Sequence, residues 1–137
     1  MDAESRIVTV EEVPKDTTLL FTVREGFDEK EVVLVRLNGE IAAWRNFCPH
    51  WIDVRLDSGS GAELRNGEIV CTRHGATFEP DSGYCTFGPC EGAYLEEVDV
   101  SVRDGDVYLT DDEYAFEHLG PKSDRDLSSG RIGFGGN

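Results

Sequence analysis

Two short Cys–His segments constrain this chain more than any other feature. Cys48-Pro49-His50 and Cys71-Thr72-Arg73-His74 each offer one thiolate and one imidazole, and 20 residues separate His50 from Cys71. Turns that contain glycine within this interval let the chain fold back on itself. Two sulfur and two nitrogen atoms can then meet at one point, which predicts a metal site. The fold must therefore bring these two loops together.

Few metals suit this set of two sulfur and two nitrogen ligands. Zinc accepts it in a tetrahedron, and an iron–sulfur cluster can place cysteines on one iron and histidines on the other. The strand-rich chain has a plausible core of its own, so a zinc ion would stabilise a domain that has no obvious need of it. An all-cysteine cluster of the plant type fits less well. Cys85 and Cys90 have its first spacing, but no cysteine follows at the next required position, and both histidines would be left unexplained.

Most of the chain is rich in strand-forming residues, and helix periodicity is missing from its first half. Three dipeptides, Asn38-Gly39, Asn66-Gly67 and Asp104-Gly105, predict tight hairpin turns. The stretch 51–65 is interpreted as a loop. Strands are expected at residues 7–10, 17–24, 30–37, 40–45, 68–72, 84–87, 95–103 and 106–110. These patterns predict an all-β fold, a small antiparallel barrel or sandwich.

The strand signals end near residue 110, which predicts one domain over residues 1–110 with its metal-binding part at about 46–92. Residues 111–119 are expected to form a short helical turn, capped by Asp111 or Asp112. Residues 123–137 are polar and rich in glycine, which is typical of a flexible tail.

The ligand segments resemble the signature of a known family. Cys48-x-His50 followed by Cys71-x-x-His74-Gly75 is similar to the Rieske [2Fe-2S] motif, and Gly88-Pro89 falls where that family has a third loop that contains proline. The order of strands and turns from about residue 5 to 110 is also similar to that of the Rieske domain. The resemblance implies a Rieske-like fold in which Cys48 and Cys71 hold one iron and His50 and His74 the other. It also implies one-electron transfer.

The chain departs from the Rieske proteins of respiratory complexes at two pairs of positions. Those proteins have an additional cysteine in each ligand loop, joined as a disulfide, where this chain has Asp53 and Arg73. We hypothesise that an Asp–Arg pair joins the loops instead. They also have a serine and a tyrosine that donate hydrogen bonds to sulfur, where this chain has Ala76 and Phe78. Because such donors stabilise the reduced cluster, their loss predicts a potential toward the low end of the Rieske range, roughly −150 mV.

Further residues near the motif have open interpretations. Cys85 and Cys90 flank the third loop and are either a disulfide that stiffens it or two buried thiols. Trp51 follows His50 directly; it shields the cluster, belongs to a docking patch or caps the small core. Trp44 is expected in the core, and His118 at the surface or at a helix end.

The net negative charge of the chain excludes some classes of partner. The chain has 28 acidic and 13 basic residues and a net charge of −15, so nucleic acid and anionic membranes would be repelled. The acidic residues are spread over the whole chain, which favours adaptation to concentrated salt. Docking onto a basic reductase is a second interpretation, compatible with the first.

The resemblance implies a soluble Rieske-type ferredoxin that carries electrons between a reductase and an oxygenase or similar enzyme. We expect an electron-transfer protein rather than a stand-alone enzyme, because the sequence has no nucleophile triad, no phosphate loop and no three-ligand iron motif of the kind that Rieske oxygenases have. No small-molecule substrate is indicated. One alternative is an electron-transfer subunit of an oxygenase or of a nitrite-reductase-like complex; another is a zinc-stabilised structural or interaction domain. The absence of a secretory signal or a membrane span in the sequence favours the cytoplasm, where thiols stay reduced.

Overall fold

The computed structural model describes residues 5–37, 40–49, 55–59, 61–71, 75–88 and 91–122. Within these residues the chain is all β apart from the 3₁₀ turn η2 (Val10–Glu12) and 3₁₀ conformation at Ser5, which confirms the predicted fold class. The strands are β1 (Arg6–Thr9), β2 (Leu19–Glu25), β3 (Asp28–Leu37), β4 (Glu40–Arg45), β5 (Glu63–Arg65), β6 (Glu68–Cys71), β7 (Ala76–Phe78), β8 (Cys85–Phe87), β9 (Val100–Arg103), β10 (Asp106–Leu109) and β11 (Ala115–Leu119).

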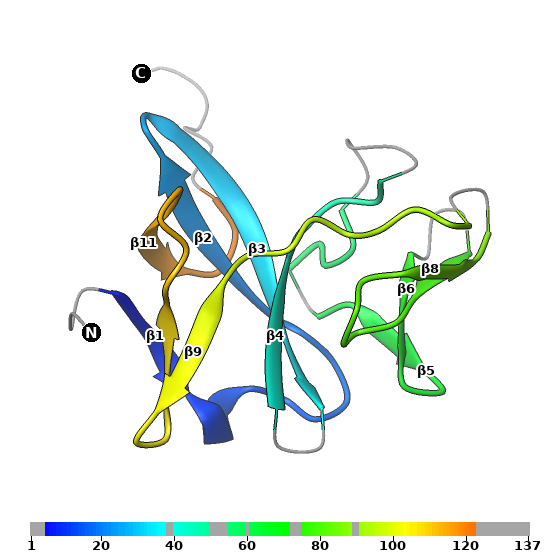
Figure 1. Ribbon diagram of the computed structural model, residues 1–137, viewed down its shortest axis with the longest axis horizontal. Coiled ribbons are helices and arrows are strands. Elements are labelled where there is room, and N and C mark those ends of the chain that lie inside the picture. Colours follow the sequence, from blue (N-terminus) through cyan, green and yellow to red (C-terminus); the bar gives the residue numbers. More distant parts are fainter. Residues whose placement is uncertain are drawn as a thin grey trace.

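The strands form three antiparallel sheets (Figure 1). One has the order β1-β10-β9, the second β11-β2-β3-β4, and the third β5-β6-β7-β8. The first two sheets pack together as the base of the molecule. The third sheet, drawn in green in Figure 1, projects to one side of this base and lies within the segment 46–92 that is expected to bind metal.

Strand β3 lies between the two cores of the molecule. Val32 and Leu34 point into the core shared with β1, β9 and β10, whereas Val33 and Val35 point into the core shared with the third sheet. All four side chains are fully buried. A strand covered on both faces needs a continuous apolar run rather than an alternating one. The run Val32–Val35 meets this need, so β3 joins the base to the third sheet.

Two of the predicted hairpin turns are described, and both have the backbone that their sequences favour. Asn66 and Gly67 have φ values of 52° and 80°, and Asp104 and Gly105 have values of 54° and 82°. Positive φ at both central residues is the mark of the type I′ turn, whose twist matches that of the flanking strands. The third turn, Asn38-Gly39, lies outside the described residues, but Leu37 pairs with Glu40 across it.

The expected helical turn over residues 111–119 is wrong. Asp111 caps a tight turn instead: its side chain accepts a hydrogen bond from the Glu113 amide at 3.0 Å, and its carbonyl accepts one from the Tyr114 amide at 3.4 Å. The chain then continues as β11, which pairs with the edge of β2. The ring of Phe116 packs against that of Phe21, with centroids 6.0 Å apart. This burial and the ladder with β2 outweigh a weak local preference for helix.

Smaller differences concern the strand boundaries. Strands β5 and β7 lie in stretches that were not predicted to be strands. The strand expected at 95–103 begins only at Val100. Residues 123–137, the expected flexible tail, lie outside the described residues.

Trp44 lies in the core, as predicted. Its side chain also connects the base to the third sheet. Its side chain is 2% exposed and its indole Nε1 donates a hydrogen bond to the carbonyl of Pro80 at 2.9 Å. Gly83 lies against the same ring: a Cβ at this position would come within 2.8 Å of Trp44 Cζ3. The turn between β7 and β8 is therefore fixed on β4.

Candidate metal centre

The two predicted cysteine ligands lie at the ends of strands and in one core. Cys48 follows the end of β4 by three residues, and Cys71 is the last residue of β6. Both side chains are 0% exposed, and both belong to the core that also contains Ala76 and Phe78. Two soft thiols are thus buried in the same apolar surroundings, which suits a metal centre shielded from water.

The second ligand loop is a closed hairpin connection. Cys71 pairs with Ala76 across β6 and β7, and the amide of Gly75 donates a hydrogen bond to the Cys71 carbonyl at 2.8 Å. Gly75 has a φ of 74°, a conformation that L side chains rarely adopt. A glycine directly after His74 therefore closes the loop behind the predicted ligand.

The first ligand loop is closed at its base by a side-chain clamp. The Asn46 amide donates to the Asp57 carbonyl at 2.7 Å, and the Asp57 amide donates to Asn46 Oδ1 at 2.8 Å. The Asp57 carboxylate then accepts hydrogen bonds from the amides of Gly59 and Gly61 and from the Thr18 hydroxyl, at 2.8, 2.9 and 2.8 Å. Asn46 and Asp57 are both buried, so these bonds are shielded from competition by water. The clamp holds the two ends of the segment that contains Cys48.

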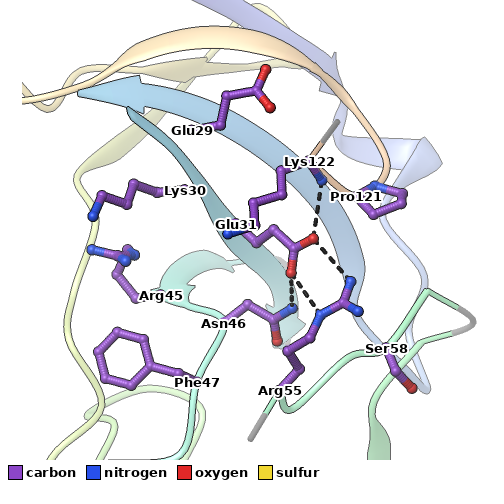
Figure 2. Close-up of a pocket in the computed structure, with 10 residues that line it drawn as sticks. All are labelled: Glu29, Lys30, Glu31, Arg45, Asn46, Phe47, Arg55, Ser58, Pro121 and Lys122. Atoms are coloured by element: carbon purple, nitrogen blue, oxygen red, sulfur yellow. Dashed lines mark hydrogen bonds and ion pairs between the residues drawn. The ribbon is translucent and has the colours of Figure 1, made fainter. Parts of the chain in front are cut away.

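Glu31 on β3 reinforces this clamp (Figure 2). Its carboxylate accepts a hydrogen bond from Asn46 at 3.1 Å and two from the Arg55 guanidinium at 2.8 and 2.9 Å. It also accepts one from the backbone amide of Lys122 at 3.0 Å. The side chain is only 8% exposed, so this ion pair is less screened than a surface pair. Glu31 therefore joins both ends of the first ligand loop to the C-terminal end of the described chain.

The third loop packs directly on the second. Gly88 follows β8, and a Cβ at this position would lie 2.7 Å from the Cα of Ala76. The loop is closed by hydrogen bonds from the Gly92 amide to the Cys85 carbonyl and from the Glu91 amide to the Gly88 carbonyl, each 3.1 Å. Only a glycine allows this close approach.

The face of β7 that points to the thiols has no hydroxyl group. Ala76 and Phe78 are both 0% exposed and lie in the core with Cys48 and Cys71. Thr77 points to the other face, where its hydroxyl lies 2.7 Å from that of Thr86. The Thr77 hydroxyl is therefore directed away from Cys48 and Cys71.

Several predicted site residues lie outside the described residues: His50, Trp51, Asp53, Arg73, His74, Pro89 and Cys90. The disulfide between Cys85 and Cys90 is therefore untested; Cys85 is buried, and its Sγ lies 3.3 Å from the Phe87 carbonyl. His118 is part of β11, not at a helix end, and is 39% exposed in its side chain. Among the described residues no group of three or more His, Cys, Asp or Glu side chains is arranged to hold a metal ion.

A protein-family model decides the identity of this centre. The model of the Rieske [2Fe-2S] domain matches residues 4–108. The chain belongs to the Rieske family. This Rieske domain therefore binds a [2Fe-2S] cluster, which sets aside the zinc alternative. The two buried thiols fit such a group, because thiolates bind its iron and the apolar core around them excludes water.

Solved Rieske structures share the fold. The ferredoxin of carbazole 1,9a-dioxygenase from Nocardioides aromaticivorans IC177 is 24% identical, with a TM-score of 0.61 over 77% of this chain and 95% of that one. The Sphingomonas yanoikuyae B1 ferredoxin is 22% identical, with a TM-score of 0.59 over 76% and 94%.

A curated relative is larger than this Rieske domain. The oxidoreductase NdmD of Pseudomonas putida is 33% identical over 84 residues, which are 61% of this chain and 13% of that protein. The chain thus matches about one eighth of its relative.

Sequence reasoning missed the residues that hold the first loop in place: Asn46, Asp57, Glu31 and Arg55. Asn46 and Asp57 stand on either side of the first motif, and each polar side chain is next to an apolar residue in the sequence. This pattern is only a weak signal that the two residues contact each other. Glu31 is 15 residues from Asn46 and 24 from Arg55, so only the register of β3 brings it to the loop.

Proposed function

We propose that this Rieske domain is a one-electron carrier that passes electrons between a reductase and an oxygenase or similar enzyme. The observation that carries the proposal is the burial of Cys48 and Cys71 in one core, within a fold that ferredoxins share over 94–95% of their length. One of the solved structures with this fold is a complex of reduced oxygenase and oxidized ferredoxin, 23% identical to this chain. Such a complex supports a protein partner rather than a small-molecule substrate.

The cluster ligands in this proposal are Cys48 and Cys71 on one iron and His50 and His74 on the other. When bound, the cluster supplies reversible one-electron chemistry. The chain's own residues hold the ends of the two ligand loops: the Asn46–Asp57 clamp closes the base of the loop that contains Cys48, and the hydrogen bond from the Gly75 amide to the Cys71 carbonyl closes the base of the loop that follows Cys71. Cysteine ligands held in this way need little reorganisation when the charge of the centre changes.

A low reduction potential is the finer part of the proposal. The two positions that carry sulfur-directed hydroxyls in respiratory Rieske proteins hold Ala76 and Phe78 here, and both are fully buried. The hydroxyl that β7 does have, that of Thr77, is hydrogen-bonded to the Thr86 hydroxyl. The added electron therefore lacks the two side-chain hydroxyl donors of respiratory Rieske proteins, which favours low-potential transfer to an oxygenase system over quinol oxidation.

The test is a redox titration of the purified protein, followed by its visible spectrum. We expect a reversible change that takes up one electron per chain, at a midpoint well below zero. A matched Cys71→Ser variant should lack the spectrum. A protein that holds iron but shows no reversible one-electron step would contradict the carrier function, and a midpoint well above zero would contradict the low potential alone.

The second candidate is an electron-transfer subunit of a larger enzyme, and the match to part of NdmD favours it. Purification from the source cells at native expression distinguishes the two: a subunit stays with a larger oxygenase or reductase component through size exclusion, whereas a carrier separates. A cytoplasmic location remains part of the proposal, and among the described residues no helix is long and apolar enough to cross a membrane.

A further inference from the structure

A cavity of about 590 Å³ lies where β3 begins and β4 ends, beside the start of the first ligand loop (Figure 2). Its lining includes four of the chain's 13 basic side chains but only two carboxylates. The charged residues are Lys30, Arg45, Arg55 and Lys122, with Glu29 and Glu31. A local excess of positive charge is unexpected in a chain with a net charge of −15.

The carboxylate of Glu31 does not neutralise the whole cavity. It is paired with the Arg55 guanidinium through two hydrogen bonds, and its remaining contacts are with the Asn46 amide and the Lys122 backbone. Glu29 Oε2 lies 3.9 Å from His118 Nε2. On the opposite side of the cavity, Lys30 has no ion pair among the described residues, and Arg45 is paired with Glu96 at 3.6 Å.

Arg45 is held in place with hydrogen-bonding capacity to spare. Its guanidinium lies over the rings of Phe47 and Tyr114, 5.2 and 5.9 Å from their centroids, and its Nη1 donates to the Tyr114 hydroxyl at 3.2 Å. Burial raises the pKa of Tyr114, so this hydroxyl stays neutral at physiological pH. Glu96 lies 3.6 Å from Nη1 but is 55% exposed, which makes it a weak counterion. Arg45 Nε is buried and has no hydrogen-bond partner among the described residues.

Lys30 lies where it can share a ligand with Arg45. Arg45 pairs with Val32 across β3 and β4, and Lys30 is two residues before Val32, so Lys30 and Arg45 are diagonal neighbours on one face. Such neighbours are about 7–8 Å apart, within reach of long side chains. In Figure 2 both side chains extend to the same side of the cavity. An oxyanion between them would offset the repulsion of two like charges and accept charge-assisted hydrogen bonds from both.

We propose that this cavity binds an oxyanion, a phosphate or a carboxylate group, between Lys30 and Arg45. The site is also placed to affect the metal centre, because Phe47, which stacks on Arg45, directly precedes Cys48. A bound anion opposes the negative charge added by reduction, so it binds the oxidised protein more tightly. By reciprocity, its binding lowers the reduction potential. The oxyanion site itself does not depend on which proteins exchange electrons with this chain.

The test titrates the oxidised holoprotein with inorganic phosphate by calorimetry, at an ionic strength kept constant with sodium chloride. We expect saturable binding that Lys30→Gln weakens by about tenfold, the effect of losing one charge-assisted hydrogen bond. Arg45→Gln should weaken it similarly, but only Lys30→Gln is expected to leave the packing of Phe47 and Tyr114 intact. Arg103→Gln, which removes an exposed charge from the β9–β10 hairpin, is the matched control.

A second titration with a penta-glutamate peptide distinguishes the two sources of the oxyanion. Binding of phosphate that depends on Lys30 assigns the site to a free anion, and binding of the peptide alone assigns it to an acidic segment of a partner. The proposal is overturned if the protein binds neither phosphate nor the peptide, or if Arg103→Gln weakens binding as much as Lys30→Gln does. The midpoint potential should also fall on saturation in the wild type and stay constant in Lys30→Gln.

Discussion

Gly88 lies directly against Ala76, so that any Cβ at position 88 would be 2.7 Å from the Cα and 3.0 Å from the Cβ of Ala76. Ala76 pairs with Cys71 on the neighbouring strand. The start of the third loop therefore contacts the first residue of β7, where the second ligand loop ends, and the absence of a side chain at Gly88 determines how closely they approach.

Replacing Gly88 with alanine should separate these two loops. The variant carries two costs: the strain of a side chain at a φ of 107°, about 1–2 kcal/mol, and overpacking against Ala76, about 1–3 kcal/mol. Gly92→Ala is the matched control, because Gly92 has a φ of 93° and nothing within 4 Å of its Cβ position. We expect Gly88→Ala to lose iron to a chelator several times faster than Gly92→Ala. Equal rates would show that the contact with Ala76 has no role in holding the cluster.

The clamp at the base of the first loop makes a second prediction. Asn46→Ala removes the hydrogen bonds to the Asp57 carbonyl and amide and to Glu31, which should lower the free energy of unfolding by about 2–4 kcal/mol. Chemical denaturation followed by the visible absorbance of the holoprotein measures this loss. Ser58→Ala, an exposed change in the same segment, should alter stability by less than about 0.5 kcal/mol. A clamp variant as stable as the wild type would refute this role.

The β character of the chain could be predicted because its signals are local. Asn66-Gly67 and Asp104-Gly105 determine their own turns, and the apolar run of β3 marks a strand whatever surrounds it. Strand β11 could not be predicted in this way. The residues from Ala115 to Leu119 have no strong local preference, and their conformation depends on the open edge of β2, more than 90 residues earlier.

The same distinction applies to the metal centre. The cysteine and histidine spacing could be recognised because ligands on one loop are close in sequence. The residues that orient the loops are far apart: Thr18 reaches Asp57 over 39 residues, and Gly88 meets Ala76 only through the pairing of β7 and β8. Such contacts follow from sheet register, which sequence patterns specify poorly.

Adding hydroxyls to β7 should raise the reduction potential. Ala76→Ser and Phe78→Tyr restore donors on the face that shares a core with Cys48 and Cys71. A donor that stabilises the reduced state by about 1 kcal/mol raises a one-electron potential by roughly 40 mV. Protein-film voltammetry measures the shift. Thr77→Val, on the outer face, should leave the potential unchanged. If Thr77→Val shifted the reduction potential as much as the other two variants, the assignment of Ala76 and Phe78 to the face that points to the thiols would be contradicted.

The proposed pairing of Asp53 with Arg73 is tested by removing one charge at a time. If the pair joins the ligand loops, Asp53→Asn and Arg73→Gln should each lose iron at a lower temperature than the wild type, and the double variant should lose little more than either single variant. Iron content after incubation at increasing temperature measures this. Two single variants that keep their full iron would show that these charges do not join the loops.

EPR of the reduced holoprotein tests the central claim most directly, because one spectrum reports both the metal and its ligands. If Cys48, His50, Cys71 and His74 hold a [2Fe-2S] cluster, the mean g value should fall below that of all-cysteine clusters, and pulsed EPR of the same sample should show couplings to imidazole nitrogen. Substituting His50 or His74 should remove part of these couplings. A colourless protein that contains one zinc ion, or a cluster spectrum without nitrogen couplings, would contradict the account.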